Sequence, residues 1–180
     1  MTMSNADSVN EEDASPIDDE SLATDATGHS VLESADQNET PRGDDVTFLV
    51  VTCQSVTFDL GEPSPLMHLM EADVPYRNIS IPIALSDAQA LYNALAIIEG
   101  RRPGTHELTS SILRQLRADV IAARIVRVDH GVYYAELDLM TPHGRERFDC
   151  RTSDAVILAL RQAVPAPILC AEEVLDSAYS

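Results

Sequence analysis

The hydrophobic pattern of this chain begins abruptly. Residues 1–45 contain few large apolar side chains and are rich in Ser, Asp, Glu, Asn and Thr. Such a segment cannot bury enough apolar surface to offset the entropy lost on ordering, so we predict a disordered acidic tail over residues 1–45. From Val46 onward, strand and helix periodicities follow one another, which predicts one domain over residues 46–178.

Runs of β-branched and aromatic residues, bounded by turn residues, predict six strands and a short seventh. The segments are residues 46–58, 66–71, 77–83, 120–128, 132–140, 145–150 and 168–170. The first is long enough to be bent, and Pro82 indicates an edge position or a strand end. Short connections that end in Gly, at residues 129–131 and 142–144, are typical of antiparallel hairpins.

Two helices are predicted between the third and fourth strands, because apolar residues recur there at helical spacing. Ser86 and Gln89 form a capping box at the start of the first helix, and Thr105 is the predicted cap of the second. The stripes expected to face the core are Ala88, Leu91, Leu95 and Ile98 in the first helix, and Leu108, Ile112, Leu113 and Leu116 in the second.

A third helix is apolar at every position from residue 155 to residue 160, so it has no polar face and has to be buried. Its start is polar instead: Thr152 can cap it, and Asp154 complements the helix dipole. A last turn is expected at residues 172–175. The order βββααβββαβ, with three main helices, predicts an α+β fold with a mostly antiparallel sheet.

The net charge of −18 is unevenly distributed. Residues 1–45 carry 13 acidic side chains and one base, Arg42, whereas the other 135 residues carry 17 acidic and 11 basic side chains. Every basic residue is Arg, which excludes Schiff-base chemistry and a P-loop lysine. The acidic balance also disfavours broad electrostatic capture of nucleic acid.

The three cysteines, Cys53, Cys150 and Cys170, fit no metal or redox spacing. They are interpreted as small buried residues in a reducing compartment. The N-terminus lacks the pattern of a secretory signal, and no apolar run approaches 18 residues. We therefore expect a cytoplasmic protein without a membrane partner.

Five motifs occur in order: residues 81–83 (IPI), 102–108 (RPGTHEL), 133–137 (YYAEL), 150–155 (CRTSDA) and 167–175 (PILCAEEVL). Together they resemble the bifunctional nuclease (BFN) domain family of bacteria and plants, over about residues 46–178. The family is named for RNase and DNase activity attributed to some members. The family usually has Pro where Thr152 stands, and often an acidic residue where Gln89 stands. The resemblance implies a nuclease of RNA or single-stranded DNA.

Phosphodiester hydrolysis needs an activated water and stabilisation of phosphoryl charge, often by divalent metals held by carboxylates. The predicted catalytic residues are His106, Glu136 and Asp154. The predicted phosphate-binding residues are Arg102 and Arg151. If the protein is a nuclease, Mg²⁺ or Mn²⁺ is expected at Asp154, Glu172 and Glu173.

Each assignment has a structural alternative. His106, in the first turn of its helix, is a candidate general base or else a surface or phosphate-contacting histidine. Glu136 and Asp138 share one strand face, which could simply be solvated. Arg151 could clamp phosphate, or it could pair with Asp154 or with Glu172 and Glu173.

Two functions from different classes remain. The first is a metal-assisted nuclease, with RNA or DNA as a substrate that the acidic balance disfavours. The second is a non-enzymatic, self-associating regulatory or interaction module with the same fold, since a fold does not determine function. In either case we expect a homo-oligomer, a dimer. Convergence of Glu136, Asp154, Glu172 and His106 on one cleft would favour the nuclease.

Overall fold

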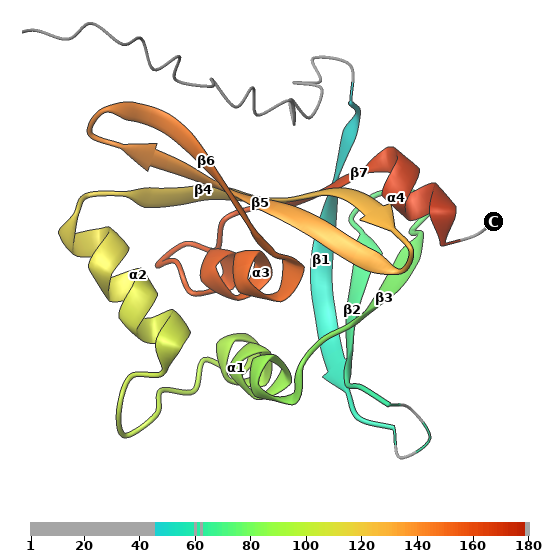
Figure 1. The fold of residues 1–180 in the computed structure, drawn as a ribbon, viewed down its shortest axis with the longest axis horizontal. Coiled ribbons are helices and arrows are strands. Elements are labelled where there is room, and N and C mark those ends of the chain that lie inside the picture. Colours follow the sequence, from blue (N-terminus) through green and yellow to red (C-terminus); the bar gives the residue numbers. More distant parts are fainter. Residues whose placement is uncertain (1–45, 60, 62, 179–180) are drawn as a thin grey trace, which may run out of the picture. The chain divides into compact units, whose positions relative to one another are not determined.

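The computed structural model describes residues 46–59, 61 and 63–178 (Figure 1). The predicted tail, residues 1–45, lies outside the described residues. The elements are β1 (Phe48–Thr57), β2 (Leu66–Glu71), β3 (Asn78–Pro82), α1 (Leu85–Leu95), α2 (Thr105–Gln115), β4 (Asp119–Asp129), β5 (Val132–Thr141), β6 (Gly144–Arg151), α3 (Thr152–Leu160), β7 (Ile168–Ala171) and α4 (Glu172–Ser177). The predicted order is confirmed, and the expected last turn is the short helix α4.

The strands form a single sheet in the order β3-β2-β1-β7-β4-β5-β6. All neighbouring pairs in it run antiparallel except β4 and β7, which are parallel. The α+β class with a mostly antiparallel sheet is therefore confirmed. Pro82 is the last residue of the edge strand β3, where its missing N–H breaks no ladder.

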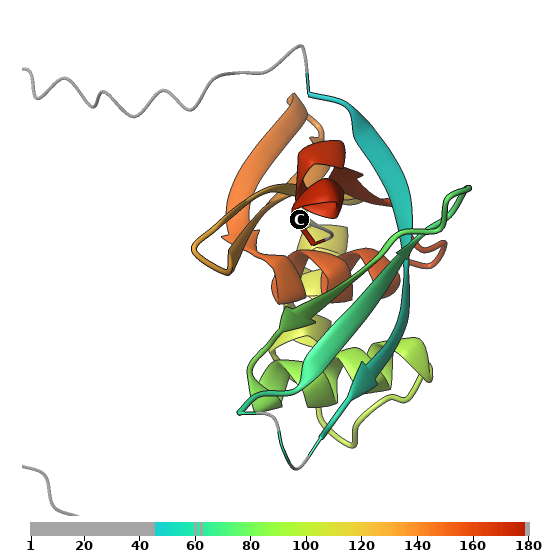
Figure 2. The same cartoon turned by 90° about the vertical axis from the view of Figure 1, so that its right-hand side faces the viewer.

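Local irregularities shape the sheet. The β1–β2 register shifts between Cys53 and Ser55, and Figure 2 shows the resulting curvature of β1. In the β4–β5 turn, His130 and Gly131 both have positive φ, at 47° and 79°. Two such residues give a turn whose twist matches that of the flanking strands, so this connection forms the predicted hairpin.

The helices α1, α2 and α3 lie on one side of β4 and β5 (Figure 1). Of these, α3 packs against both strands and against both other helices. Residues 155–159 of α3 are at most 6% exposed, which confirms the predicted buried helix. None of the helices in the described ranges is long and apolar enough to span a membrane.

Helix α2 differs from the prediction. Leu108, Ile112 and Leu116, expected in the core, are 55%, 49% and 65% exposed. The buried residues of α2 are instead His106 and Ser110. Helical periodicity identifies an apolar face but not what covers it. Here α2 turns His106, Ser110 and the partly buried Leu113 toward the core, so only Leu113 of the predicted stripe packs inward and the other three residues face outward.

The predicted N-caps are also wrong. Ser86, Thr105 and Thr152 lie inside the first turns of α1, α2 and α3. The N-cap positions are Ala84, Gly104 and Arg151, and none of them forms a side-chain cap hydrogen bond. Thr152 Oγ1 instead donates a hydrogen bond to the carbonyl of Tyr133, at 3.1 Å. This hydroxyl therefore ties α3 to β5 rather than capping its own helix.

The strand face that carries Glu136 and Asp138 is not simply solvated. Asp138 has no exposed surface and accepts a hydrogen bond from Arg145 Nε at 2.8 Å. Arg147 Nε lies 3.8 Å from the same carboxylate. Glu136 pairs with Arg124 at 3.7 Å. Charged pairs across β4, β5 and β6 therefore hold this face together.

We expect Asp138 to contribute to acid unfolding. Burial by itself raises the pKa of Asp138, but hydrogen bonds and charge from Arg145 and Arg147 outweigh it, so the pKa lies below its ordinary value. The resulting stability is complete above the unfolded pKa of about 3.9, and it is lost as pH falls through the lower folded value. Urea unfolding should therefore show stability falling below about pH 4. An Asp138→Asn variant should be less stable at neutral pH and lose less on acidification. Equal losses in both proteins would assign the effect to other carboxylates.

Candidate functional site

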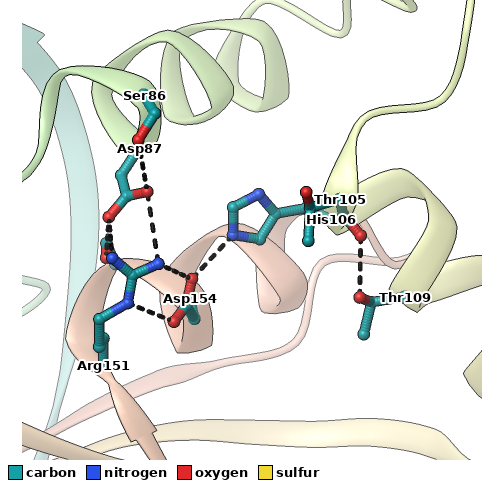
Figure 3. A network of polar contacts seen from close by, with 8 residues as sticks. Ser86, Asp87, Thr105, His106, Thr109, Arg151 and Asp154 are labelled. Carbon is teal, nitrogen blue, oxygen red and sulfur yellow. Dashed lines mark hydrogen bonds and ion pairs between the residues drawn. The ribbon is translucent and has the colours of Figure 1, made fainter.

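Arg151 lies at the junction of β6 and α3, where it bridges two carboxylates (Figure 3). Its Nε donates a hydrogen bond to Asp154 Oδ2, and its Nη2 donates one to Asp154 Oδ1, both at 2.8 Å. Its Nη1 lies 2.9 Å from Asp87 Oδ2. The bidentate contact confirms the predicted pairing of Arg151 with Asp154, and the contact with Asp87 joins α3 to α1.

Asp87 is only 5% exposed, although it lies in the first turn of α1. Ser153 Oγ donates a hydrogen bond to its Oδ2 at 2.9 Å, and Ser86 Oγ donates one to its Oδ1 at 3.3 Å. With Arg151, these contacts satisfy a buried carboxylate that would otherwise be costly. Asp87 therefore anchors a second edge of the Arg151 guanidinium, next to the edge that Asp154 contacts.

His106 comes from α2 and approaches Asp154 from the other side, as Figure 3 shows. Its Nε2 lies 3.0 Å from Asp154 Oδ1. The residue is 9% exposed, so the alternative of a surface histidine is wrong. Three helices thus contribute to one polar cluster, which we call the Asp–Arg–Asp–His cluster: Asp87, Arg151, Asp154 and His106.

The electrostatics of the cluster favour an ionised Asp154. Burial raises the pKa of Asp154, but hydrogen bonds from Arg151 and then His106 outweigh this effect and hold the pKa below its ordinary value. The same contact with Asp154 raises the pKa of Arg151. Asp154 is therefore a fixed negative charge beside the His106 ring.

Cys150 lies next to the cluster in the sequence, and its thiol is partly buried. Burial raises the pKa of Cys150 to about 11, so its thiol is protonated at neutral pH. Burial likewise raises the pKa of Cys53 and of Cys170 to about 12. Cys170 is buried, and Cys53 and Cys150 are partly buried, as predicted for small packing residues.

Two hollows flank the cluster. The first, of about 410 Å³, is lined by all four members of the cluster and by Arg102, Gln89, Glu107 and Gly104, among others. The second, of about 250 Å³, lies between residues 81–84 of the β3–α1 connection and Tyr133 of β5. It shares Asp87 and Arg151 with the first. The cluster is therefore accessible to a ligand from two sides.

The structure brings four predicted residues together and leaves three elsewhere. His106, Asp154, Arg102 and Arg151 line the first hollow. Glu136 is paired with Arg124 on β4, and Glu172, the first residue of α4, lies 3.8 Å from Arg77. Glu173 follows Glu172 on α4. Neither of these two nor Glu136 lines either hollow, so only His106 and Asp154 meet of the four residues whose convergence would favour the nuclease.

Asp87 was missed by the sequence-based assignment. Its signal was present, because an aspartate follows the IPI motif at the start of a helix. An acidic residue in a first turn normally serves the helix dipole, and its sequence position does not reveal burial. Contact with Arg151, 64 residues further along, is what gives Asp87 its place in the cluster.

The cluster does not fit a divalent metal in this arrangement. A cation shared by Asp87 and Asp154 would lie where the guanidinium of Arg151 already lies, within 2.9 Å of both carboxylates. Over the described ranges, no three His, Cys, Asp or Glu side chains are grouped as metal ligands. The positive charge between the carboxylates is thus supplied by the chain itself.

A fold and site of this kind define an α+β domain with a partly buried cluster of two aspartates, an arginine and a histidine. The comparisons with known proteins give its family. The family model described as "Bifunctional nuclease domain" matches residues 68–180, and the chain belongs to this family. The chain is also 33% identical, over 101 residues, to two proteins of Mycobacterium tuberculosis, the uncharacterized proteins MT1877 (strain CDC 1551) and Rv1829 (strain H37Rv). The match covers 56% of this chain and 59% of each relative.

Proposed function

We propose that this protein is a phosphodiester hydrolase of RNA or DNA whose reaction takes place at the Asp–Arg–Asp–His cluster. Membership of the bifunctional nuclease domain family supports this proposal. The observation that carries it is the contact between His106 and an ionised Asp154, beside a hollow that Arg102 also lines. We further propose a cytoplasmic location, from the cysteine content.

The Asp154–His106 contact suits general-base catalysis. An ionised carboxylate only accepts hydrogen bonds, so the hydrogen shared with Asp154 belongs to Nε2 of His106. In the neutral ring, Nδ1 then carries the lone pair and can take a proton from an attacking water. The oxygen of that water forms the new bond to phosphorus, and the bond to the leaving oxygen breaks. Solvent gives a proton to the leaving oxygen, and His106 releases the proton it took to solvent.

The two arginines have different tasks in this proposal. Arg102 lines the hollow and forms no ion pair with any residue of the described part of the chain, so it is available to a phosphate oxygen. Arg151 is held by both carboxylates and positions Asp154 for His106. Its side chain is nevertheless 62% exposed, so its outer edge can also face phosphoryl charge.

The test is cleavage of single-stranded RNA and DNA by the purified chain, with and without EDTA. Arg151 between the carboxylates leads us to expect that cleavage survives EDTA, whereas the sequence predicts dependence on Mg²⁺ or Mn²⁺. Cleavage abolished by EDTA and restored by either ion would support the metal, with a rearranged Arg151. No cleavage under any of these conditions would contradict the proposed hydrolase.

A second candidate, the self-associating module, is favoured by one specific observation. The stripe of Leu108, Ile112 and Leu116 leaves three large apolar side chains about half exposed or more along a single helix. These residues are spaced four apart and form one continuous face. A second copy of the same helix, packed antiparallel, would cover it and give a twofold dimer. This surface does not overlap the first hollow.

Replacing Ile112 with Glu should convert such a dimer to a monomer, because a charge would be buried at the centre of the helix pair. The measurement is molar mass by light scattering during size exclusion. Tyr92→Glu on α1, an equally exposed large side chain, is the matched control and should leave the mass unchanged. A wild-type protein that is already monomeric would rule out this interface.

A further inference from the structure

A third hollow, of about 280 Å³, lies between α2 and the C-terminal end of α3. Its lining residues are Glu99, Gly100, Pro103, Glu107, Ser110, Ser111, Arg114 and Arg161. It shares Gly100 and Glu107 with the hollow that contains the Asp–Arg–Asp–His cluster. The two hollows are therefore neighbours, and Gly100 and Glu107 line both of them.

Buried donors without partners are the distinctive feature of this third hollow. Ser110 is 7% exposed, and the side chain of Arg161 is 12% exposed. Ser110 Oγ and the Nε of Arg161 have no hydrogen-bond partner among the described residues. The Nη2 of Arg161 is paired with Glu107, whose Oε1 lies 2.5 Å away. Buried donors are almost always satisfied, so these groups indicate a missing acceptor.

The chemistry of the lining selects an anion of low charge. Guanidinium nitrogens can only donate, and a hydroxyl can donate as well, so the missing group supplies acceptor oxygens. Arg114 adds a second guanidinium, and planar arginine forks match phosphate oxygens. The carboxylates of Glu99 and Glu107 oppose negative charge in the same hollow. A singly charged phosphodiester is therefore better suited than doubly charged inorganic phosphate.

We propose that the hollow of Ser110, Arg114 and Arg161 binds a second phosphodiester of the strand whose scissile phosphate lies at Arg102 and His106. This inference rests on the proposed function, because it names a subsite for the same polynucleotide. Glu107 holds Arg161 in place when the subsite is empty. The shared wall of Gly100 and Glu107 lets one strand occupy both hollows.

The test is the equilibrium binding of single-stranded RNA oligonucleotides with one, two and three phosphodiesters, measured by competition at constant ionic strength. In the wild type, passing from one to two or three phosphodiesters should tighten binding by about tenfold, the size of one charge-assisted contact. Arg114→Gln and Ser110→Ala should remove most of this gain. Arg101→Gln removes the same charge from an exposed residue that lines none of the three hollows and should keep the gain.

Urea unfolding controls for structural damage. Ser110→Ala loses no hydrogen bond, so its stability should equal or exceed that of the wild type. A full length-dependent gain in both variants would overturn the subsite, even if cleavage persists. Inorganic phosphate could instead stabilise the protein against urea in a way that depends on Arg114, without any gain in affinity for longer strands. That result would also overturn the proposed subsite, because the hollow would then bind a free ion. Absence of cleavage contradicts only the proposed hydrolysis, since the length-dependent gain does not need turnover.

Discussion

Replacing Asp154 with Asn should lower phosphodiester cleavage by about 10²–10⁴-fold, the range for loss of acid–base catalysis, with the fold intact. The amide keeps the size of the side chain but loses the charge. It no longer forces the hydrogen of the His106 ring onto Nε2, so Nδ1 is no longer fixed as the proton acceptor. Arg151 keeps its contact with Asp87, so the junction of β6 and α3 should hold. The measurement is the initial rate on single-stranded RNA at several pH values.

The matched control is Asp73→Asn, which removes the same charge from an exposed position outside the cluster. It should cleave at the wild-type rate. Urea unfolding of the Asp154→Asn preparation separates catalysis from folding. A role limited to the helix dipole predicts a loss of only about 0.3–1 kcal/mol and unchanged cleavage. That result would remove Asp154 from the chemistry and favour the self-associating module.

Leu158→Ala should cost about 2–5 kcal/mol of unfolding free energy, the range for a buried leucine that leaves a cavity. Leu158 is 6% exposed in the middle of α3, which packs against α1, α2, β4 and β5. Because these elements surround α3 on several sides, a small movement of one of them would not fill the cavity that Leu158→Ala leaves. The measurement is denaturant unfolding of the wild type and the variant at the same pH.

Val164→Ala is the control for this substitution, because Val164 is 82% exposed. It should change stability by less than about 0.5 kcal/mol, as surface substitutions usually do. If Leu158→Ala were equally mild, α3 could not be the centre of the core. The placement of the cluster at its first turn would then also be in question.

The sequence by itself determined the number, order and type of nearly all the elements. Strands such as Leu66–Glu71 and the hairpin turn at His130 and Gly131 depend on side chains that are neighbours in the sequence. The burial of α3 followed in the same way, since a helix that is apolar on every side has no face to leave in water. The family motifs likewise contained His106, Arg151 and Asp154 before their positions in space were known.

Only the tertiary structure decided which faces meet. The apolar stripe of α2 predicted burial of Leu108, Ile112, Leu113 and Leu116, yet only Leu113 packs against the core, together with the buried His106 and Ser110. Asp87 joined the cluster through a residue 64 positions away, whereas Glu136 pairs with Arg124 across β4 and β5. Local periodicity gives each element an inner and an outer face, but the partner of a charged side chain depends on chain packing over long sequence separations. For this reason the sequence could supply the residues of the site but not their arrangement.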